Sequence, residues 1–137
     1  MADQVQFELV APERLLLSEP VDMVVVPGSE GDFGVLPGHA PLISTVRPGV
    51  IEIYHGKAVK DRIFVAGGFA EVTCERCTVL AEEAIPLVEI DRSAVEAEAR
   101  TVREDVGLAK DPSEREAAER RLAVAEAKLA ALQQAGR

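Results

Sequence analysis

Residues 28–41 read Gly28-Ser29-Glu30-Gly31-Asp32-Phe33-Gly34-Val35-Leu36-Pro37-Gly38-His39-Ala40-Pro41, with four glycines and two prolines. Glycine reaches positive φ at no steric cost, whereas proline fixes φ and donates no backbone hydrogen bond. The stretch therefore predicts tight turns around one short apolar segment, residues 33–36, and neither a helix nor a central strand. A purely structural double turn between strands is an open alternative. A phosphate-cradling loop is disfavoured, because no Lys-Ser/Thr pair and no helical pattern follow the glycines.

Short β-type segments lie on both sides of this stretch. Residues 5–9 alternate apolar and polar side chains, the period of a half-buried strand, and the β-branched run 21–26 ends at Pro27. The same reasoning predicts further strands at residues 15–17, 42–47, 50–54, 58–65, 69–74 and 77–84. Short strands with a turn roughly every eight to twelve residues indicate a β-sandwich or barrel.

The composition changes near residues 86–90. Seven of the eight prolines, eight of the ten glycines and every aromatic residue precede Leu87. Residues 1–87 carry 13 acidic and 6 basic side chains, a net charge of −7, whereas residues 88–137 carry 11 and 9, a net charge of −2. We therefore predict two domains, a β-domain over residues 1–87 and a helical domain over residues 88–137.

The second domain has the spacing of two helices. Asp91 is a predicted N-cap, and Gly107 is predicted to end the first helix. An apolar stripe recurs between them, at Val95, Ala99, Val102 and Val106. A second helix opens at residues 111–114 with an acidic N-cap, a proline and a glutamate. Its coiled-coil-like seam consists of Ala118, Leu122, Ala125, Leu129 and Leu132.

The loop between these helices is short, so we expect them to return antiparallel as a hairpin. Small residues in the seam bury little apolar area, at roughly 25 cal/mol per Å². The packing therefore fits a movable hairpin, and a permanently folded one is an equal alternative.

Length, charge and composition narrow the function classes. The protein has 137 residues, of which 47% are hydrophobic, and a net charge of −9. The negative charge disfavours nucleic acid and anionic lipid surfaces as partners. No apolar run approaches the roughly 18 residues that span a bilayer, and no signal-like segment opens the sequence. We therefore expect a soluble, cytoplasmic protein without direct membrane insertion.

Chemically reactive side chains form no catalytic pattern. Cys74 and Cys77 form a C-x-x-C pair, but tetrahedral zinc needs four ligands and a redox motif would open a helix, so two thiols beside a surface turn are expected. The two histidines, His39 and His55, have no nucleophile placed beside them by the sequence. The acids at 82–83 point to opposite faces of a predicted strand, so they cannot form a dyad. We predict a non-catalytic protein without a cofactor or metal.

Several motifs occur in an order that resembles the epsilon subunit of bacterial F-type ATP synthase. Residues 28–34 and 36–42 carry the signature, and similar motifs follow at 47–50, 65–69 and 78–82. The specific resemblance runs from about Phe7 to Ala84 and continues as a general helical pattern. It implies a flattened β-sandwich of about ten strands followed by an antiparallel two-helix hairpin.

The resemblance also implies a non-catalytic rotor subunit of the proton-transporting ATP synthase, peripheral to the bacterial inner membrane on its cytoplasmic side. Epsilon subunits lie in the central stalk, dock on the gamma subunit and on the polar loops of the c-ring, and help torque reach the catalytic head. The matching partner-binding residues are Ser29, Glu30, Gly31 and Asp32 toward the c-ring and His39, Ala40, Pro41 and Leu42 toward gamma. We expect both segments to lie on one docking face, with Glu30 and Asp32 pairing with basic residues of the ring.

The helical hairpin of this family can extend along gamma and block ATP hydrolysis. The resemblance then makes Arg115, Arg120 and Arg121 candidates for contacting the alpha/beta catalytic head. Simple helix solvation is the alternative, in which Glu116 pairs with Arg120 four residues later.

Some family members have a nucleotide-binding motif, Ile/Leu-Asp-x-x-Arg-Ala, at the position of residues 90–94. Asp91 and Arg92 are the candidate nucleotide contacts here. Ala94 replaces the arginine whose guanidinium would pair with phosphate, so a capped helix start is the plainer interpretation.

Two other function classes compete with a rotor subunit. One is a small-ligand sensor whose hairpin folds over a nucleotide. The other is a cupin-like enzyme, which is disfavoured because cupins gather several histidines around a metal and this protein has two.

Overall fold

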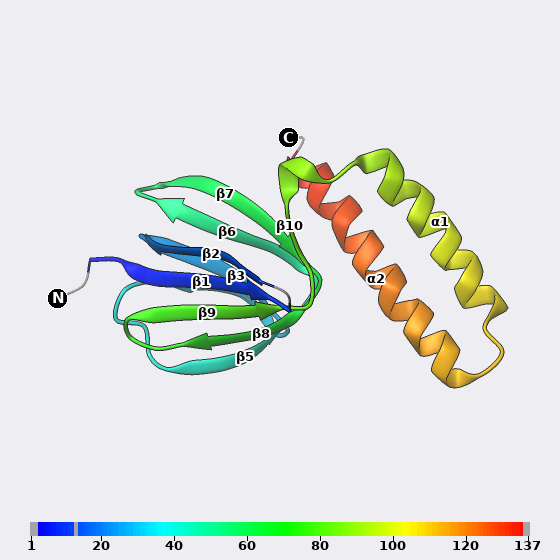
Figure 1. The fold of residues 1–137 in the computed structure, drawn as a ribbon, viewed down its shortest axis with the longest axis horizontal. Coiled ribbons are helices and arrows are strands. Elements are labelled where there is room, and N and C mark those ends of the chain that lie inside the picture. Colours follow the sequence, from blue (N-terminus) through cyan, green and yellow to red (C-terminus); the bar gives the residue numbers. More distant parts are fainter. Residues whose placement is uncertain (1–2, 13, 136–137) are drawn as a thin grey trace. The chain divides into compact units, whose positions relative to one another are not determined.

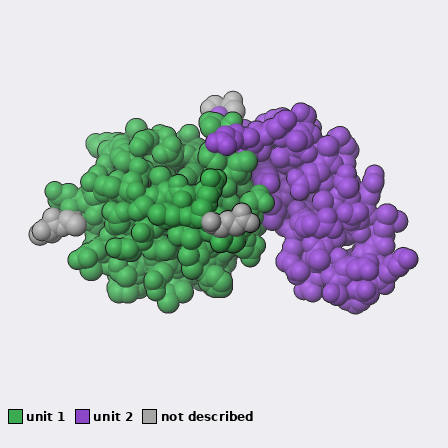
Figure 2. Space-filling model, viewed as in Figure 1, with its two compact units in different colours: residues 1–88 green, residues 89–137 purple. Residues whose placement is uncertain are grey.

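The computed structural model describes residues 3–12 and 14–135, which form ten β-strands, a short 3-10 turn and two α-helices (Figure 1). These elements form two compact units, Met1–Val88 and Glu89–Arg137 (Figure 2). The first unit is a curled, sandwich-like sheet and the second is a helical hairpin, so the predicted fold class is confirmed.

The β-domain is a single sheet that curls on itself. Its strands are β1 (Val5–Ala11), β2 (Arg14–Val21), β3 (Met23–Gly28), β4 (Gly31–Val35), β5 (Leu42–Val46), β6 (Gly49–His55), β7 (Ala58–Val65), β8 (Gly68–Val72), β9 (Arg76–Ala81) and β10 (Ala84–Pro86). They lie in the order β10-β7-β6-β3-β5-β8-β9-β1-β2, and β4 pairs with β3 beside this path. Among the paired strands of the described residues, only β1 and β9 run parallel.

The inward side chains of the curled sheet make one apolar core. β2, at one end of the strand order, lies against β6, and the side chain of Glu19 meets His55 at 3.6 Å and Lys60 at 3.7 Å. The largest fully buried side chains of this core are Phe7, Leu9, Ile51 and Ile53, together with seven valines. Burying one such side chain contributes about 1.5–3 kcal/mol, so this core supplies most of the stability of the domain.

The structure changes several predicted strand boundaries. The stretch predicted as turns holds the five-residue strand β4, because Phe33 and Val35 alternate toward the core while Asp32 and Gly34 face outward. Val21 ends β2 instead of opening the next strand, since the backbone bends at Asp22. The predicted strand 77–84 is two strands, β9 and β10, separated by a bend. The acids at 82–83 lie in that bend, so placing them on a strand was wrong.

The second unit is an antiparallel pair of helices, α1 (Arg92–Leu108) and α2 (Pro112–Ala135), preceded by the 3-10 turn η1 (Leu87–Glu89). Two ion pairs cross between the helices, Arg103–Glu126 at 3.5 Å and Arg121–Asp105 at 3.4 Å. The buried residues of the two helices are Val95, Ala99, Val102, Ala118, Ala125 and Ala131. The three predicted seam leucines are partly buried, and the most deeply buried residues of α2 are alanines.

Both predicted helix starts are confirmed by their caps. Asp91 Oδ1 accepts hydrogen bonds from the backbone N–H of Ser93 at 3.0 Å and of Ala94 at 3.5 Å. At the second start, Asp111 Oδ1 accepts from Glu114 N–H at 2.8 Å. The first helix includes Gly107 and ends one residue later, because the backbone becomes extended at the residue after Leu108.

Candidate partner-binding surfaces

A two-residue turn, Ser29–Glu30, joins β3 to β4. Gly28 and Gly31 pair directly across it. Gly31 has φ 138°, a conformation that other residues rarely adopt. A Cβ at Gly28 would lie 2.7 Å from the carbonyl oxygen of Gly31 and 2.9 Å from the ring of Phe33. This tight turn therefore depends on glycine at both ends.

The end of β5 holds this turn from the side. Ser29 N–H donates to the carbonyl oxygen of Thr45 at 3.0 Å, and the two hydroxyl oxygens lie 2.5 Å apart. Arg47 Nη1 donates to the carbonyl oxygen of Gly28 at 2.5 Å, while Arg47 Nη2 lies 2.5 Å from Asp32 Oδ1. Side chains at the end of one strand thus fix both the first residue of the turn and an acid just after it.

Glu30 in the turn and Asp32 at the start of β4 have different surroundings. Asp32 is bound to Arg47, so its charge is already compensated within the β-domain. Glu30 is exposed and makes no ion pair among the residues that the structure describes. The sequence alone predicts both acids as charges that pair with a partner. Of the two, Glu30 is the one with a charge available to another protein.

The second predicted partner segment, His39–Leu42, lies at the opposite end of β4 from the turn. Its path is set by backbone hydrogen bonds, from Gly38 N–H to the Cys74 carbonyl at 2.9 Å and from His39 N–H to the Leu36 carbonyl at 3.1 Å. His39 Nδ1 lies 2.6 Å from the carbonyl oxygen of Ala40, to which it donates in the Nδ1–H tautomer. The turn and this segment lie at the two ends of β4, and β5 also connects them, because Ser29 contacts Thr45 and Leu42 opens the same strand. That both segments lie on one docking face stays a prediction.

An apolar stripe crosses the outer face of the sheet over five neighbouring strands, β5, β8, β9, β1 and β2. In register, Phe69 pairs with Leu80, Leu80 with Val10, and Val10 with Leu15. Phe69, Leu80 and Leu15 are 56%, 54% and 55% exposed, and Ile43 on β5 is 73% exposed. We call these five residues the outer stripe.

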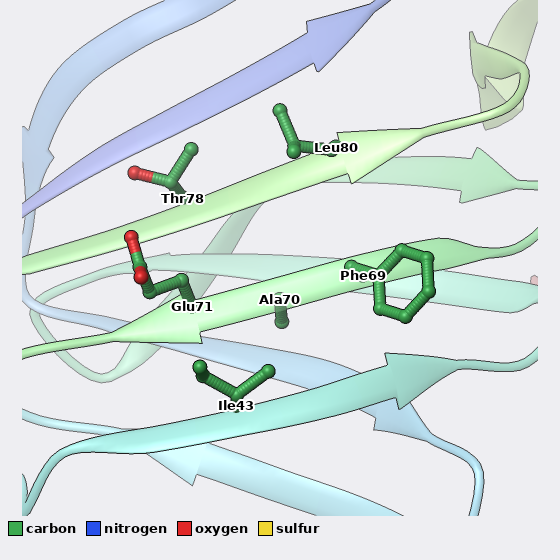
Figure 3. Close-up of a pocket in the computed structure, with 6 residues that line it drawn as sticks. All are labelled: Ile43, Phe69, Ala70, Glu71, Thr78 and Leu80. Atoms are coloured by element: carbon green, nitrogen blue, oxygen red, sulfur yellow. The ribbon is translucent and has the colours of Figure 1, made fainter.

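The centre of the outer stripe is a shallow depression of about 230 Å³. Figure 3 shows its lining on three neighbouring strands, with Ile43, Phe69 and Leu80 as its large apolar members and Glu71 and Thr78 beside them. The polar side continues onto β1, where Thr78 and Arg76 reach Glu8, Arg76 at 2.8 Å. A large apolar patch with a polar rim is typical of a protein interaction site.

The outer stripe is not among the surfaces that the sequence predicts. Alternation in β8 and β9 shows that the side chains divide between two faces, but it does not say which face is inside. The larger Phe69 would be assigned to the core, whereas Ala70 and Val72 occupy it. The close approach of β8 and β9 at Gly68, where a Cβ would lie 2.0 Å from the Leu80 carbonyl oxygen, fixes the register that turns Phe69 outward.

The C-x-x-C pair does not form a site. The two cysteines flank a surface bend, as the sequence predicts, and they differ in exposure, because Cys74 is exposed and Cys77 is buried in the core. Burial raises the pKa of Cys77 to about 12, which further suppresses the reactive thiolate form of this side chain. Within residues 3–12 and 14–135, no group of three or more His, Cys, Asp or Glu residues is placed to hold a metal ion.

Two of the three candidate arginines of the helical hairpin form ion pairs within the hairpin. Arg115 pairs with Glu119 at 3.7 Å, and Arg121 pairs with Asp105 across the hairpin. Arg120 is exposed, and among the described residues it lacks the predicted pair with Glu116. Neither helix of the described residues is long and apolar enough to cross a membrane.

The candidate nucleotide contacts have a structural use. Asp91 places its carboxylate at the cap of α1, where it also accepts a hydrogen bond from the Ser93 hydroxyl at 3.0 Å. Arg92 is the exposed first residue of the same helix. The helix-start interpretation therefore accounts for Asp91 without a ligand.

The curled β-domain carries an exposed apolar stripe with a polar rim, which is typical of a protein that binds other proteins. Residues 4–87 match the family model described as ATP synthase, Delta/Epsilon chain, beta-sandwich domain, and residues 91–137 match the model for the C-terminal domain of the ATP synthase epsilon chain. The protein belongs to the ATP synthase epsilon chain family. Membership in this family makes it a non-catalytic subunit of its complex.

Relatives from several bacteria support this assignment. The ATP synthase epsilon chain of Rhodospirillum rubrum is 57% identical over 96% of this sequence and 98% of its own length. That of Rhodospirillum centenum is 58% identical over 94% and 92%. One polypeptide in the Euglena gracilis mitochondrial ATP synthase structure of OSCP, F1 and c-ring has a TM-score of 0.85 and 29% identity, covering 96% of this protein and 83% of that one.

Proposed function

We propose that this protein is a central-stalk subunit of the bacterial F-type ATP synthase that couples rotation of the c-ring to the catalytic head through the gamma subunit. Two surfaces carry this role. The outer stripe docks on gamma, and the turn at Ser29–Glu30 contacts the polar loops of the c-ring. The resemblance of the fold to a polypeptide in an assembly with F1 and c-ring supports this proposal.

The outer stripe is the observation that carries the proposal. Four of its side chains stand more than half exposed on one face of the sheet, which is costly unless a partner covers them. A permanent rotor contact needs such a surface, because long-lived interfaces have apolar centres with polar rims. The predicted gamma segment also leads into the stripe, since Leu42 directly precedes Ile43 at the start of β5.

The turn suits a different kind of contact. Its backbone is fixed by glycines and by β5, and Glu30 presents an exposed carboxylate. Such a turn can pair with basic side chains on a polar loop of the c-ring without changing its own backbone conformation. Exposed ion pairs contribute only about 0.2–1 kcal/mol each, so this contact complements the outer stripe and does not replace it.

These contacts also give the location. The subunit is held at the cytoplasmic side of the bacterial inner membrane through its partners, as a peripheral protein. Its net charge of −9 disfavours an independent attachment to anionic lipid, which supports attachment through protein contacts.

The helical hairpin has a separate, regulatory role in this proposal. The interface between the two helices is closed mainly by alanines, so its burial stabilises the hairpin only weakly. The hairpin can therefore open at modest cost and extend along gamma toward the catalytic head. The exposed Arg120 is then available for an acidic surface there.

Binding of full-length variants to purified gamma subunit tests the proposal. The double variant Phe69→Ser, Leu80→Ser should bind about a hundredfold more weakly than the wild-type protein, because two apolar contacts are lost. Val88→Ser is the matched control, since Val88 is 95% exposed but lies outside the stripe. Equal affinity of the double variant and the control would contradict the proposed gamma contact.

A further inference from the structure

We propose that Arg47 is a positioning residue, which locks the Ser29–Glu30 turn to β5 so that the turn and the outer stripe move as one rigid body. This inference rests on the proposed function, in which the two surfaces face different rotor partners. It assigns to one side chain the mechanical link between them.

The link is needed because backbone pairing between β3 and β5 is minimal. In the described residues these strands pair at a single position, Gly28 with Val46. By contrast, β5 pairs with β8 along its whole length, from Leu42 with Val72 to Val46 with Gly68. β5 is thus firmly part of the face that carries the outer stripe. The turn, by contrast, depends on additional contacts to stay fixed to β5.

Arg47 supplies most of these contacts. Its backbone N–H donates to the Pro27 carbonyl oxygen at 2.9 Å, and its guanidinium holds the carbonyl of Gly28 and the carboxylate of Asp32. The contacts therefore include one group before the turn and one after it. The pair Ser29–Thr45 adds a further point of attachment to β5.

Arginine is suited to this task by its geometry. Its planar guanidinium directs two N–H groups at once, here to a carbonyl oxygen and to a carboxylate. A lysine ammonium is a single point charge, so it would keep the pairing with Asp32 but lose the fixed fork. The identity of residue 47, and not only its charge, therefore sets how rigidly the turn is held.

Amide hydrogen exchange in the full-length protein measures this rigidity directly. In Arg47→Met the Ser29 N–H should exchange about tenfold faster, because its acceptor on Thr45 is no longer held beside it. The Asp22 N–H, which donates to the Tyr54 carbonyl at 3.0 Å, should keep its rate. The control Arg62→Met removes an exposed ion pair with Glu52 elsewhere in the sheet and should change neither amide.

The functional readout uses ATP synthase depleted of its own epsilon subunit and reconstituted in vesicles. Arg47→Met should bind gamma like the wild-type protein but support proton-driven ATP synthesis at a rate several times lower, with Arg47→Lys between the two. Arg62→Met should match the wild type.

Each of two results would overturn the inference. One is unchanged Ser29 exchange in Arg47→Met, and the other is full synthesis by that variant at saturating concentration. Loss of gamma binding by Arg47→Met would also count against it, because the turn would then not be separable from the stripe. Failure of the proposed function has a different signature, namely normal gamma binding by the Phe69→Ser, Leu80→Ser variant.

Discussion

At the scale of single residues, Glu30 carries the exposed charge of the β3–β4 turn. Glu30→Lys should weaken binding to a gamma–c-ring complex by about twofold to tenfold at 0.1 M salt, because an attractive exposed pair becomes repulsive. The difference should largely vanish near 1 M salt, where the screening length falls from about 10 Å to about 3 Å. Glu116→Lys makes the same charge change in α2 and serves as control. A Glu30→Lys variant that binds like this control at both salt concentrations would contradict the c-ring contact.

The buried thiol of Cys77 makes the stability of the protein depend on pH in a direction that follows from its pKa. Burial raises the pKa of Cys77 from 9.0 to about 12, so between these values the folded state keeps a proton that the unfolded state releases. The free energy of unfolding should therefore fall as pH rises above about 9, by up to about 1.4 kcal/mol per pH unit from this group. Well below pH 9 the group contributes no slope.

Urea denaturation at pH 8, 9 and 10 measures this effect. Cys77→Ala lacks the thiol, so its stability should fall less steeply across the same range, although the cavity lowers its stability overall. Identical slopes for the two proteins would refute the assignment of the alkaline slope to Cys77.

At the scale of elements, the β8–β9 pair depends on Gly68. This residue has φ 143°, and a Cβ would lie 2.0 Å from the Leu80 carbonyl oxygen. Gly68→Ala should therefore reduce the free energy of unfolding by about 2–4 kcal/mol, through both strain and a forced shift of β9. Gly56→Ala, at φ 67° with open space around it, should cost only about 1 kcal/mol. Urea unfolding followed by Tyr54 fluorescence measures both variants. Similar losses of unfolding free energy in Gly68→Ala and Gly56→Ala would contradict this explanation.

The division into two units predicts which fragments of the protein fold alone. The fragment of residues 1–88 contains the whole curled sheet and its core, so it should fold alone with β-type circular dichroism. The fragment of residues 89–137 should be only marginally helical, because its alanine-rich interface does not offset the cost of helix nucleation. An unfolded 1–88 fragment would show that the division into two domains is wrong.

The elements differ in how far the sequence could predict them. The two helix starts were predictable because their caps are local, with acceptor and donor within three residues. Strand β4 was missed because its alternation of Phe33 and Val35 is interrupted by glycines. The outer stripe and the Arg47 contacts depend on which distant strands become neighbours, and no local pattern encodes the pairing of β9 with β1 or the reach of Arg47 to Gly28.

At the scale of the whole molecule, the β-domain carries coupling and the hairpin carries regulation in the proposed function. The surfaces assigned to coupling, the outer stripe and the Ser29–Glu30 turn, lie in β-strands or turns before residue 88. The hairpin contributes none of the outer stripe and none of the Ser29–Glu30 turn. This division makes the account testable by one reconstitution.

Proton-driven ATP synthesis by vesicles that contain epsilon-depleted ATP synthase tests the central claim most directly. Added at saturating concentration, the full-length protein and the 1–88 fragment should both restore synthesis, while the Phe69→Ser, Leu80→Ser variant should restore little at concentrations that saturate the wild type. Val88→Ser should restore synthesis fully. Full restoration by the double variant, or failure of a folded 1–88 fragment to restore synthesis, would contradict the claim that this protein couples the rotor through its β-domain.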